Sequence, residues 1–490
     1  MRLRMGLSNL WGVFTWSTVV SLCLCLGCDR GETGTTARQE PAETKQDQGP
    51  LRLVVVDDPE FADAILAQWA ARAETQLNVR QITAAEMLDE SKSLDTDVVI
   101  YPSRYLGELV ERRLIMPLPK EAISAKDFEW SDILELVRLR ETAWGEKTYA
   151  VPLGSPIPLL WYRPDLLEAA SVDVPRSWPA YIEAAKKLAN RESLGAAAGA
   201  ADRPWSGTLE PLASNSVVDL FLAHAAASVR HRSQYSTLFD FRTMEPLING
   251  PAFVEALEQL VEIAKLSPES LTRGVDQVRE SFVRGECAMA IAWPSRGAPQ
   301  VRDLPAPRSV AFAELPGSDR VYNASEKKWE SRRAEESSTV PLLGAAGRIG
   351  SITRESPRAR SSLNLLRLLS STAWSTEVAP QSKNTAPFRH SHRDHASNWL
   401  DEGLDSGAGE SYFDAIQSAN SKPLYLLTLR LPGRDAYHAA LASAIDAALR
   451  GELAPTDALE QAATRWREIT AQRDLEKQRQ AYRRSLGLEF

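Results

Sequence analysis

Short apolar runs alternate along this chain with longer segments in which apolar residues recur every three to four positions. The run Leu51–Val56 predicts a buried strand, and the segment from Pro59 to about Gln76 predicts a helix with one apolar face. Asp97–Tyr101 (DVVIY) predicts a second buried strand, and Tyr105–Arg112 follows it in helical period. This alternation predicts an α/β fold with a parallel sheet that helices cover on both sides.

A candidate ligand-binding edge follows from this alternation. In open α/β sheets, ligands bind at the edge where strands end and helices begin. The loop Asp57-Asp58-Pro59 follows the first predicted strand, and the loop Tyr101-Pro102-Ser103-Arg104 follows the second. We therefore expect side chains of these two loops to face a ligand.

The C-terminal part predicts two amphipathic helices. The first carries apolar residues on one face from Tyr437 to Leu449 and stops before a glycine, a residue typical of helix C-termini. The second begins near Pro455 and carries apolar residues on one side as far as Ile469. Residues 471–490 are strongly charged, and we expect them to form a tail that extends into solvent.

The first 28 residues have the composition of an export signal. Arg2 and Arg4 precede an apolar stretch from about residue 7 to 26, and a cysteine follows a small residue at its end. This ending resembles a bacterial lipoprotein signal, which implies cleavage after residues 1–27 and a lipid on Cys28. A transmembrane helix, or secretion with cleavage at another position, is the alternative reading of the same stretch.

The segment after the signal predicts a tether. Beyond Cys28, the residues up to Pro50 include no large apolar side chain, so they cannot bury enough surface to offset the entropy of ordering. We expect residues 28–50 to be a disordered link between a membrane anchor and a body outside the cytoplasm. No later stretch approaches membrane-spanning length.

Charge and cysteine content exclude several classes of protein. The formal net charge is −8 and there is no long basic run, which argues against nucleic acid as a partner. Three of the four cysteines lie in the signal region, so Cys287 has no partner for an internal disulfide. Cys287 has apolar neighbours, and we expect it to be a buried hydrophobic residue.

Four further segments follow one another in a recognisable order. They are Tyr149–Trp178, Phe239–Leu257, Phe282–Pro294 and Leu315–Leu369. Their motifs, among them LLWYRPDLL and FVRGECAMAI, resemble those of the family 1 extracellular solute-binding proteins, which include maltose-binding protein. The resemblance extends from residue 51 to about residue 470.

This resemblance implies a type II periplasmic binding protein fold, in which two α/β lobes close on a ligand and the chain crosses between them three times. Crossings are expected at Gly154-Ser155-Pro156, at Ala292-Trp293-Pro294 and at Ser370–Trp374. A glycine beside a proline is a suitable hinge composition. The implied first lobe comprises 51–153 and 294–372, and the second comprises 154–293 and 373–470.

The ligand-binding candidates combine aromatic and polar residues. In the sugar-binding members of the family, aromatic rings stack on pyranose faces and planar polar groups bind the hydroxyls, which suits the chemistry of both. The candidates are Asp58, Tyr101, Ser103, Arg104, Ser155, Asn215, Trp293, Arg348 and Tyr437. Core packing is the alternative for the aromatic residues, and a solvated loop position is the alternative for the charged ones.

The function expected from the resemblance is solute capture for an ABC importer. The chain would deliver a small solute, by default a carbohydrate, to permease subunits in the membrane. We expect a monomer without catalytic residues, cofactor or metal, because no acid/base pair, triad or metal-ligand spacing stands out, including in the polar His390–His395 loop. A sensor or assembly lipoprotein is the alternative, and the Asp57-Asp58 pair keeps a polyamine ligand open.

Overall fold

The computed structural model describes residues 49–72, 76–198, 204–213, 216–296, 309–401, 404 and 406–488. All of them fall within one unit of the chain, 47–490. The predicted signal peptide (1–27), the predicted lipidation site Cys28, nearly all of the predicted tether (28–50) and the candidate Asn215 lie outside the described residues.

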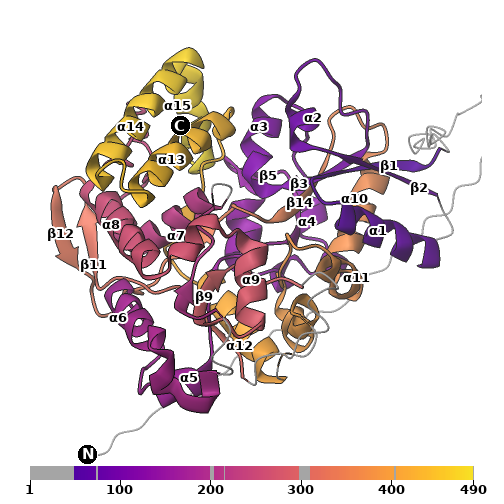
Figure 1. The fold of residues 1–490 in the computed structure, drawn as a ribbon. Helices are drawn as coiled ribbons and strands as arrows, with labels where there is room; N and C mark the ends of the chain where they lie inside the picture. Colours follow the sequence, from indigo (N-terminus) through magenta and orange to yellow (C-terminus); the bar gives the residue numbers. More distant parts are fainter. Residues whose placement is uncertain are drawn as a thin grey trace, which may run out of the picture. The chain divides into compact units, whose positions relative to one another are not determined.

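The first sheet has five strands in the order β2-β1-β3-β14-β6. Figure 1 labels β1, β2, β3 and β14 of this sheet. Its strands are β1 (Leu51–Val56), β2 (Leu77–Ile82), β3 (Val98–Pro102), β6 (Val151–Gly154) and β14 (Arg348–Ile352). β1, β2 and β3 are parallel, as predicted, whereas β14 runs antiparallel to both β3 and β6. The sheet is therefore mixed, because β14 runs in the direction opposite to the other four strands.

Helices cover this sheet, as the period of the apolar residues predicts. They are α1 (Pro59–Arg72), α2 (Ala84–Leu88), α3 (Leu106–Glu111), α10 (Ala359–Ser370) and α11 (Thr372–Val378). α1 buries Phe61 and Ile65, and it is described as far as Arg72, just before residues outside the described part of the chain. Its Trp69 ring lies 6.0 Å from the Trp374 ring of α11, which ties the two helices together.

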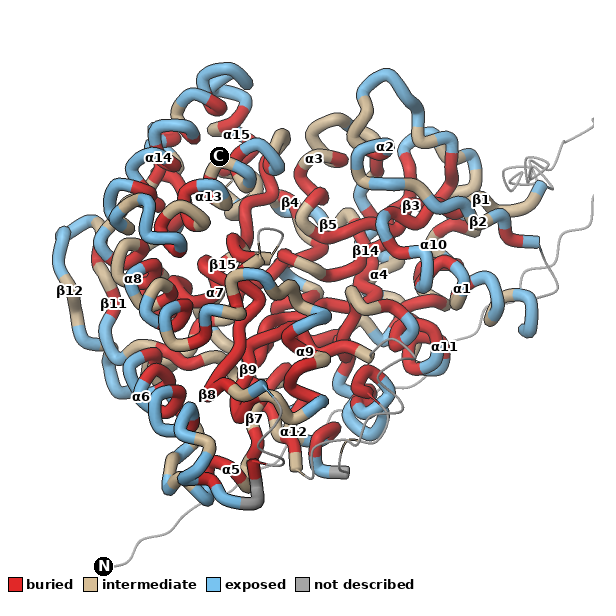
Figure 2. Tube along the Cα trace, viewed as in Figure 1, coloured by how far each residue is buried: buried red, intermediate tan, exposed pale blue. Residues whose placement is uncertain are grey.

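A second, four-stranded sheet has the order β10-β7-β9-β8. Its strands are β7 (Leu159–Tyr162), β8 (Ser206–Leu209), β9 (Cys287–Ala292) and β10 (Ala311–Ala313). The helices around it are α5 (Pro164–Ala169), α6 (Trp178–Ala189), α7 (Val217–Val229), α8 (Pro251–Leu266) and α9 (Val275–Val283). Figure 2 shows β8 and β9, like β3 and β14, buried along their length. The expected burial of Cys287 is confirmed.

The segment after the second expected crossing stays with the second sheet for longer than the implied lobe boundaries place it. β10 pairs antiparallel with β7. The hairpin of β11 (Arg320–Asn323) and β12 (Lys328–Ser331) packs on α7 and α8. The chain rejoins the first sheet only at β14. Three-residue strands carry no sequence signal of their partner, so this exchange was not predictable from the pattern.

Four helices are described in the C-terminal part, and the two predicted ones, Arg434–Leu449 and Pro455–Gln472, bury the faces that their periodicity predicts. The four helices are α12 (Ser406–Asn420), α13 (Arg434–Leu449), α14 (Pro455–Gln472) and α15 (Leu475–Ser485). The remaining short elements are α4 (Lys120–Ile123), β4 (Ala143–Trp144), β5 (Lys147–Thr148), β13 (Leu342–Leu343) and β15 (Leu426–Leu427).

The expectation of a solvent-extended tail at 471–490 differs from the structure, because α15 packs back on the body. The Tyr482 side chain is buried, and its hydroxyl accepts hydrogen bonds from the backbone N–H groups of Leu238 and Phe239. Arg484 forms an ion pair with Glu111 of α3 at 2.6 Å. Gln478, Ala481 and Tyr482 form a narrow buried face that the charged composition of the segment conceals.

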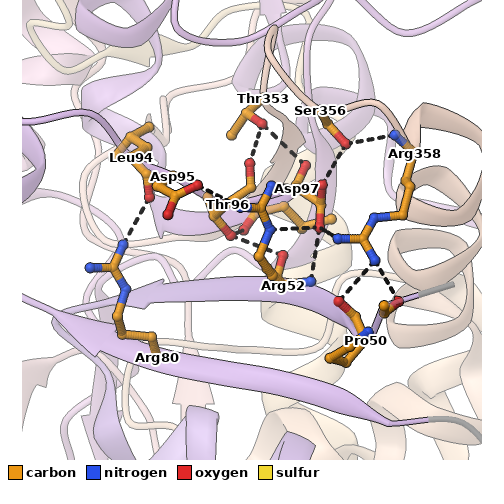
Figure 3. Close-up of polar contacts among 12 residues, drawn as sticks. Pro50, Arg52, Arg80, Leu94, Asp95, Thr96, Asp97, Thr353, Ser356 and Arg358 are labelled. Carbon is orange, nitrogen blue, oxygen red and sulfur yellow. Dashed lines mark hydrogen bonds and ion pairs between the residues drawn. The ribbon is translucent and has the colours of Figure 1, made fainter. Parts of the chain in front are cut away.

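A buried carboxylate holds the amino end of the first sheet together (Figure 3). Asp97, just before β3, accepts hydrogen bonds from the backbone N–H of Arg52 at 3.0 Å and from the Ser356 hydroxyl at 2.9 Å. Arg358 lies 3.0 Å from the same carboxylate and also donates to the Pro50 carbonyl at 2.9 Å. Burial alone would raise the pKa of Asp97, but the hydrogen bonds of Arg52 and Ser356 hold it below its usual value. This network ties residues 49–52 to the start of β3 and to the segment after β14.

Candidate functional site

The loops after β1 and before β14 meet in a fully buried ion pair at the opposite end of the sheet. Asp58 Oδ2 accepts from Arg348 Nε at 2.8 Å, from the Ser382 hydroxyl at 2.6 Å and from Asn384 Nδ2 at 3.0 Å. Its other oxygen caps α1 through the N–H of Phe61. Burial lowers the pKa of Arg348, although Asp58 opposes the shift. Both candidates from the sequence therefore lie at the predicted edge, bound to each other.

Beside this pair, Tyr105 lies between two arginines. The guanidinium carbon of Arg104 is 5.1 Å from the Tyr105 ring centroid, and that of Arg434 is 6.0 Å from it. Arg104 also donates to the Ala345 carbonyl at 3.1 Å. The Tyr105 hydroxyl donates to Asp435 Oδ2 at 3.1 Å, and burial raises the pKa of Tyr105. This stack links the turn after β3 to the first turn of α13.

Asp219, in the first turn of α7, lies close to two basic side chains of the neighbouring helix α13. Its Oδ1 lies 3.8 Å from His438 Nε2 and 4.0 Å from an Arg434 nitrogen. The Thr428 hydroxyl donates to the same oxygen at 3.2 Å. Burial would raise the pKa of Asp219, but His438, Arg434 and Arg104 hold it well below its usual value. The carboxylate is thus held ionised over the ordinary pH range.

These residues form one polar cluster. It comprises Asp58, Arg104, Tyr105, Asp219, Arg348, Arg434, Asp435 and His438. The first sheet and the turn after β3 supply one half, and α7 and α13, which pack on each other, supply the other half. The cluster contains three carboxylates, three guanidiniums and the His438 ring. Two of the guanidiniums, those of Arg348 and Arg434, form ion pairs with its carboxylates. The cluster is therefore close to charge balance.

A second buried carboxylate, Glu141, lies in the π-helical turn η4 (Val137–Glu141). Its Oε1 accepts from the Ser155 hydroxyl at 2.5 Å and from the Gly344 N–H at 3.2 Å. Neither Glu141 Oε2 nor the Ser103 hydroxyl has a hydrogen-bond partner among the described residues. Burial raises the pKa of Glu141, against the effect of these hydrogen bonds. Glu141 thus joins the segment at the first expected crossing to the segment that leads into β14.

The three aromatic candidates differ in their hydrogen-bonding environment. Tyr101 and Tyr437 are fully buried, and their hydroxyls contact Ser351 at 2.9 Å and Thr470 at 3.0 Å. Trp293 is 7% exposed, and its Nε1 has no hydrogen-bond partner among the described residues. The two tyrosines therefore have polar partners inside the fold, whereas Trp293 retains an unused donor. A ligand contact by any of the three stays a prediction.

The sequence reasoning did not single out Tyr105, Asp219, Asp435 or His438. A signal for two of them was present, since Asp435 and His438 are three residues apart at the start of a predicted helix. Asp435 and His438 do not lie on the apolar face that begins at Tyr437. The apolar periodicity of the helix therefore does not identify them. Asp219 carries no local signal, because its role depends on the packing of α7 against α13.

Two further observations concern the described residues only. No helix among them is both long and apolar enough to cross a membrane. Within the same residues, no group of three or more His, Cys, Asp or Glu side chains is arranged to hold a metal ion. His392, in the histidine-rich loop, is buried, and burial lowers its pKa to about 3.

Comparison with known proteins identifies the family to which this chain belongs. The sequence model of the bacterial extracellular solute-binding proteins matches residues 57–319, more than half of the chain. Similar solved structures include an Agrobacterium radiobacter K84 ABC transporter solute-binding protein with ribitol (17% identity, 86% of this chain and 98% of that chain, TM-score 0.63). Maltose-bound MalE3 of T. maritima has 17% identity, 86% and 100% coverage and a TM-score of 0.61.

The sugar-binding protein MalE from Xanthomonas citri matches with 17% identity, 87% and 98% coverage and a TM-score of 0.62. At these identities the solved structures establish the fold, which is the two-lobed type II architecture that the sequence motifs imply. The family match rests on the sequence itself. The chain therefore belongs to the bacterial extracellular solute-binding protein family.

Proposed function

We propose that this protein captures a neutral, hydroxyl-rich solute, a carbohydrate or a polyol, for an ABC importer. The observation that supports this most directly is the charge balance of the polar cluster, in which carboxylates and guanidiniums already face each other. Such an array offers donors and acceptors to hydroxyl groups but no net charge to an ion. Solved structures of similar fold hold ribitol and maltose, in agreement with this class.

A polyamine ligand has less support. Its sequence argument was the Asp57-Asp58 pair, and both carboxylates already have partners. Asp58 is occupied by Arg348, Ser382 and Asn384, and Asp57 Oδ1 accepts from the backbone N–H of Ala84 at 3.0 Å. A polyamine would have to displace these bonds, so the neutral solute is the better match.

The proposed binding residues come from both halves of the cluster. Arg104 and Tyr105 would contact the solute from the first lobe, and Asp219 and His438 would contact it from the second. The Trp293 indole, with its unused N–H, is the aromatic residue best suited to lie against a sugar ring. A solute that touches both halves stabilises the closed arrangement of the lobes over the open one.

The lobe boundaries in this proposal follow the strand pairings. Residues 51–154 and the segment from β14 to about residue 385 accompany the first sheet. Residues 156–331 accompany the second. The crossings then fall near Ser155, near Gly344 and in the segment after Ser382. Glu141 contacts two of the three.

Anchoring and delivery complete the proposal. A lipid on Cys28 and a tether of residues 28–50 would hold the body near a membrane, where permease subunits of the importer receive the solute. The body begins at Pro50, whose carbonyl is held by Arg358. A sensor with the same fold would share the binding step and lack the permeases. Solute uptake by cells with and without the gene separates these two roles.

A thermal-shift screen tests the ligand class. The protein with Cys28→Ser, purified as a soluble chain, is screened against polyols, mono- and oligosaccharides, polyamines and metal ions. The correct solute at a hundred times its dissociation constant stabilises the native state by about 2.7 kcal/mol. A shift with a sugar or polyol supports the proposal, and a shift with polyamines alone contradicts it.

A further inference from the structure

A cavity of about 270 Å³ lies outside the polar cluster. Its walls come from η4, the end of α7, the segment around β15 and the end of α15. None of Asp58, Arg104 and Arg348 lines it. We call it the three-arginine cavity, after Arg140, Arg230 and Arg430 in its walls.

The cavity lining carries positive charge and no carboxylate, although buried Glu141, which lies outside the lining, acts electrostatically on Arg430. No Asp or Glu lies in its lining, and among the described residues no carboxylate forms an ion pair with any of its arginines. The Arg140 guanidinium is exposed and lies 5.3 Å from the Tyr425 ring centroid. The protein has a net charge of −8, so a cavity lined by three arginines is a locally positive region on a negatively charged protein.

Two of the arginines are held in place by backbone carbonyls. Arg230 is half-buried, and its Nε donates to the Tyr425 carbonyl at 3.1 Å. Arg430 is buried and donates to the Glu141 carbonyl at 3.0 Å, while its Nε has no partner among the described residues. Burial lowers the pKa of Arg230, and the charge of Arg140 lowers it further. Carbonyl dipoles fix both groups, Glu141 offsets part of the charge of Arg430, and Arg230 forms no ion pair with a carboxylate among the described residues.

Besides the arginines, the lining has an apolar part and the hydroxyl groups of Thr237, Thr428 and Ser485. Leucine side chains from the β15 segment and the end of α15 line the cavity together with the Tyr482 ring. A bound inorganic ion would use the arginines and leave this surface bare. A molecule with an anionic group at one end and an apolar body at the other would use both.

We propose that the three-arginine cavity binds a small organic anion, a carboxylate or phosphate carried on an apolar group. This site is distinct from the solute site and does not rest on the proposed function. Thr428 is the point of contact between the two, since it lines the cavity and its hydroxyl donates to Asp219.

Calorimetric titration of the soluble Cys28→Ser chain tests the proposal with three probes. Benzoate and phenyl phosphate carry the two anionic groups on one ring, and benzamide is a neutral molecule of similar shape. We expect saturable binding of at least one of the anions, weakening as salt rises, and no comparable binding of benzamide. Which anion binds more tightly identifies the preferred group.

Two variants and one control locate the binding. Arg140→Gln and Arg230→Gln each weaken anion binding by about tenfold, the loss typical of one charged hydrogen bond. Arg140 is exposed, so that variant keeps its fold even if Arg230→Gln melts early. The control is Arg393→Gln, which removes another exposed arginine that lies over an aromatic ring, 4.8 Å from Phe413. Equal binding of benzamide, or parental affinity in Arg140→Gln, overturns the proposal.

Discussion

The hydroxyl of Tyr105 donates a hydrogen bond of 3.1 Å to Oδ2 of Asp435. Tyr105 follows the first-sheet strand β3, and Asp435 lies in the first turn of α13, so one bond connects residues 330 positions apart. In the proposed lobe arrangement this bond joins the two lobes, so it would form in the closed arrangement and be absent from an open one. It therefore contributes to the balance between the two.

Tyr105→Phe tests that contribution. The variant loses one hydrogen bond to a carboxylate and keeps the ring between the two arginines. The loss is worth about 1 kcal/mol, so solute affinity falls by about fivefold while the melting temperature changes little. Calorimetric titration with the hit from the screen measures the affinity. Tyr322→Phe, on β11 and outside the polar cluster, serves as the matched control. An equal effect in both variants would show that the Tyr105–Asp435 hydrogen bond has no special effect on solute affinity.

Asp97→Asn probes the base of the first sheet. Replacing the carboxylate leaves Arg52 and Arg358 without their buried counter-charge, and unfolding at neutral pH becomes easier by about 3 kcal/mol. Because the folded pKa of Asp97 is lowered, its stabilisation is complete above about pH 4, the ordinary Asp value, and is lost as pH falls further. Urea unfolding at pH 7 and near pH 3 should show the difference between parent and variant shrinking.

The control for this pair of measurements is Asp95→Asn. Asp95 also bonds Arg52, but its side chain is 76% exposed, so its loss should be nearly neutral at both pH values. If the Asp97 and Asp95 variants unfold alike, the network of Figure 3 contributes no more than an ordinary surface pair.

Glu141→Gln has the opposite pH signature. The folded pKa of Glu141 is raised, so the parent is most stable below the ordinary Glu value of about 4.3 and loses stability as pH rises through the folded pKa. The glutamine variant has no such loss, and each unit of pKa shift is worth about 1.4 kcal/mol. Melting temperatures from pH 4 to pH 8 should therefore favour the variant increasingly. A constant difference, as expected for the exposed control Glu146→Gln, would show that Glu141 does not titrate.

Membrane attachment is tested by Cys28→Ser. The variant lacks the thiol that the signal resemblance predicts to be acylated, so the folded body should leave the membrane fraction. Fractionation and immunoblotting measure this, with Cys23→Ser inside the signal as the control. Retention of the Cys28 variant on membranes would favour an uncleaved apolar anchor instead.

The periodicity of apolar residues was enough to predict two strands of the first sheet, β1 and β3, and the C-terminal helices α13 and α14. Leu51–Val56 forms β1 with the predicted bounds, and the predicted strand 97–101 appears as β3, shifted by one residue. The partner of β10 and the docking of α15 were not predictable. Both depend on contacts between distant segments, such as Phe312 against Tyr412 and Tyr482 against the 237–239 backbone.

The same limit applies to the site. Asp58, Arg104 and Arg348 were candidates from strand ends and motif matches, and the structure pairs Asp58 with Arg348. Contact of any of them with a ligand stays a prediction. Asp219 entered the cluster only through helix packing. On α13, the apolar period drew attention to Tyr437, whereas its neighbour His438 faces Asp219.

These two neighbours provide the most direct test of the solute site. The solute identified in the screen is titrated into the parent, His438→Ala and Tyr437→Phe, with melting temperatures recorded for each. We predict about tenfold weaker binding for His438→Ala at a nearly unchanged melting temperature. Tyr437→Phe should bind normally and lose only the stability of its hydroxyl bonds to Thr470 and Gln478. Parental affinity in His438→Ala together with weakened binding in Tyr437→Phe would contradict the assignment of the polar cluster as the solute site.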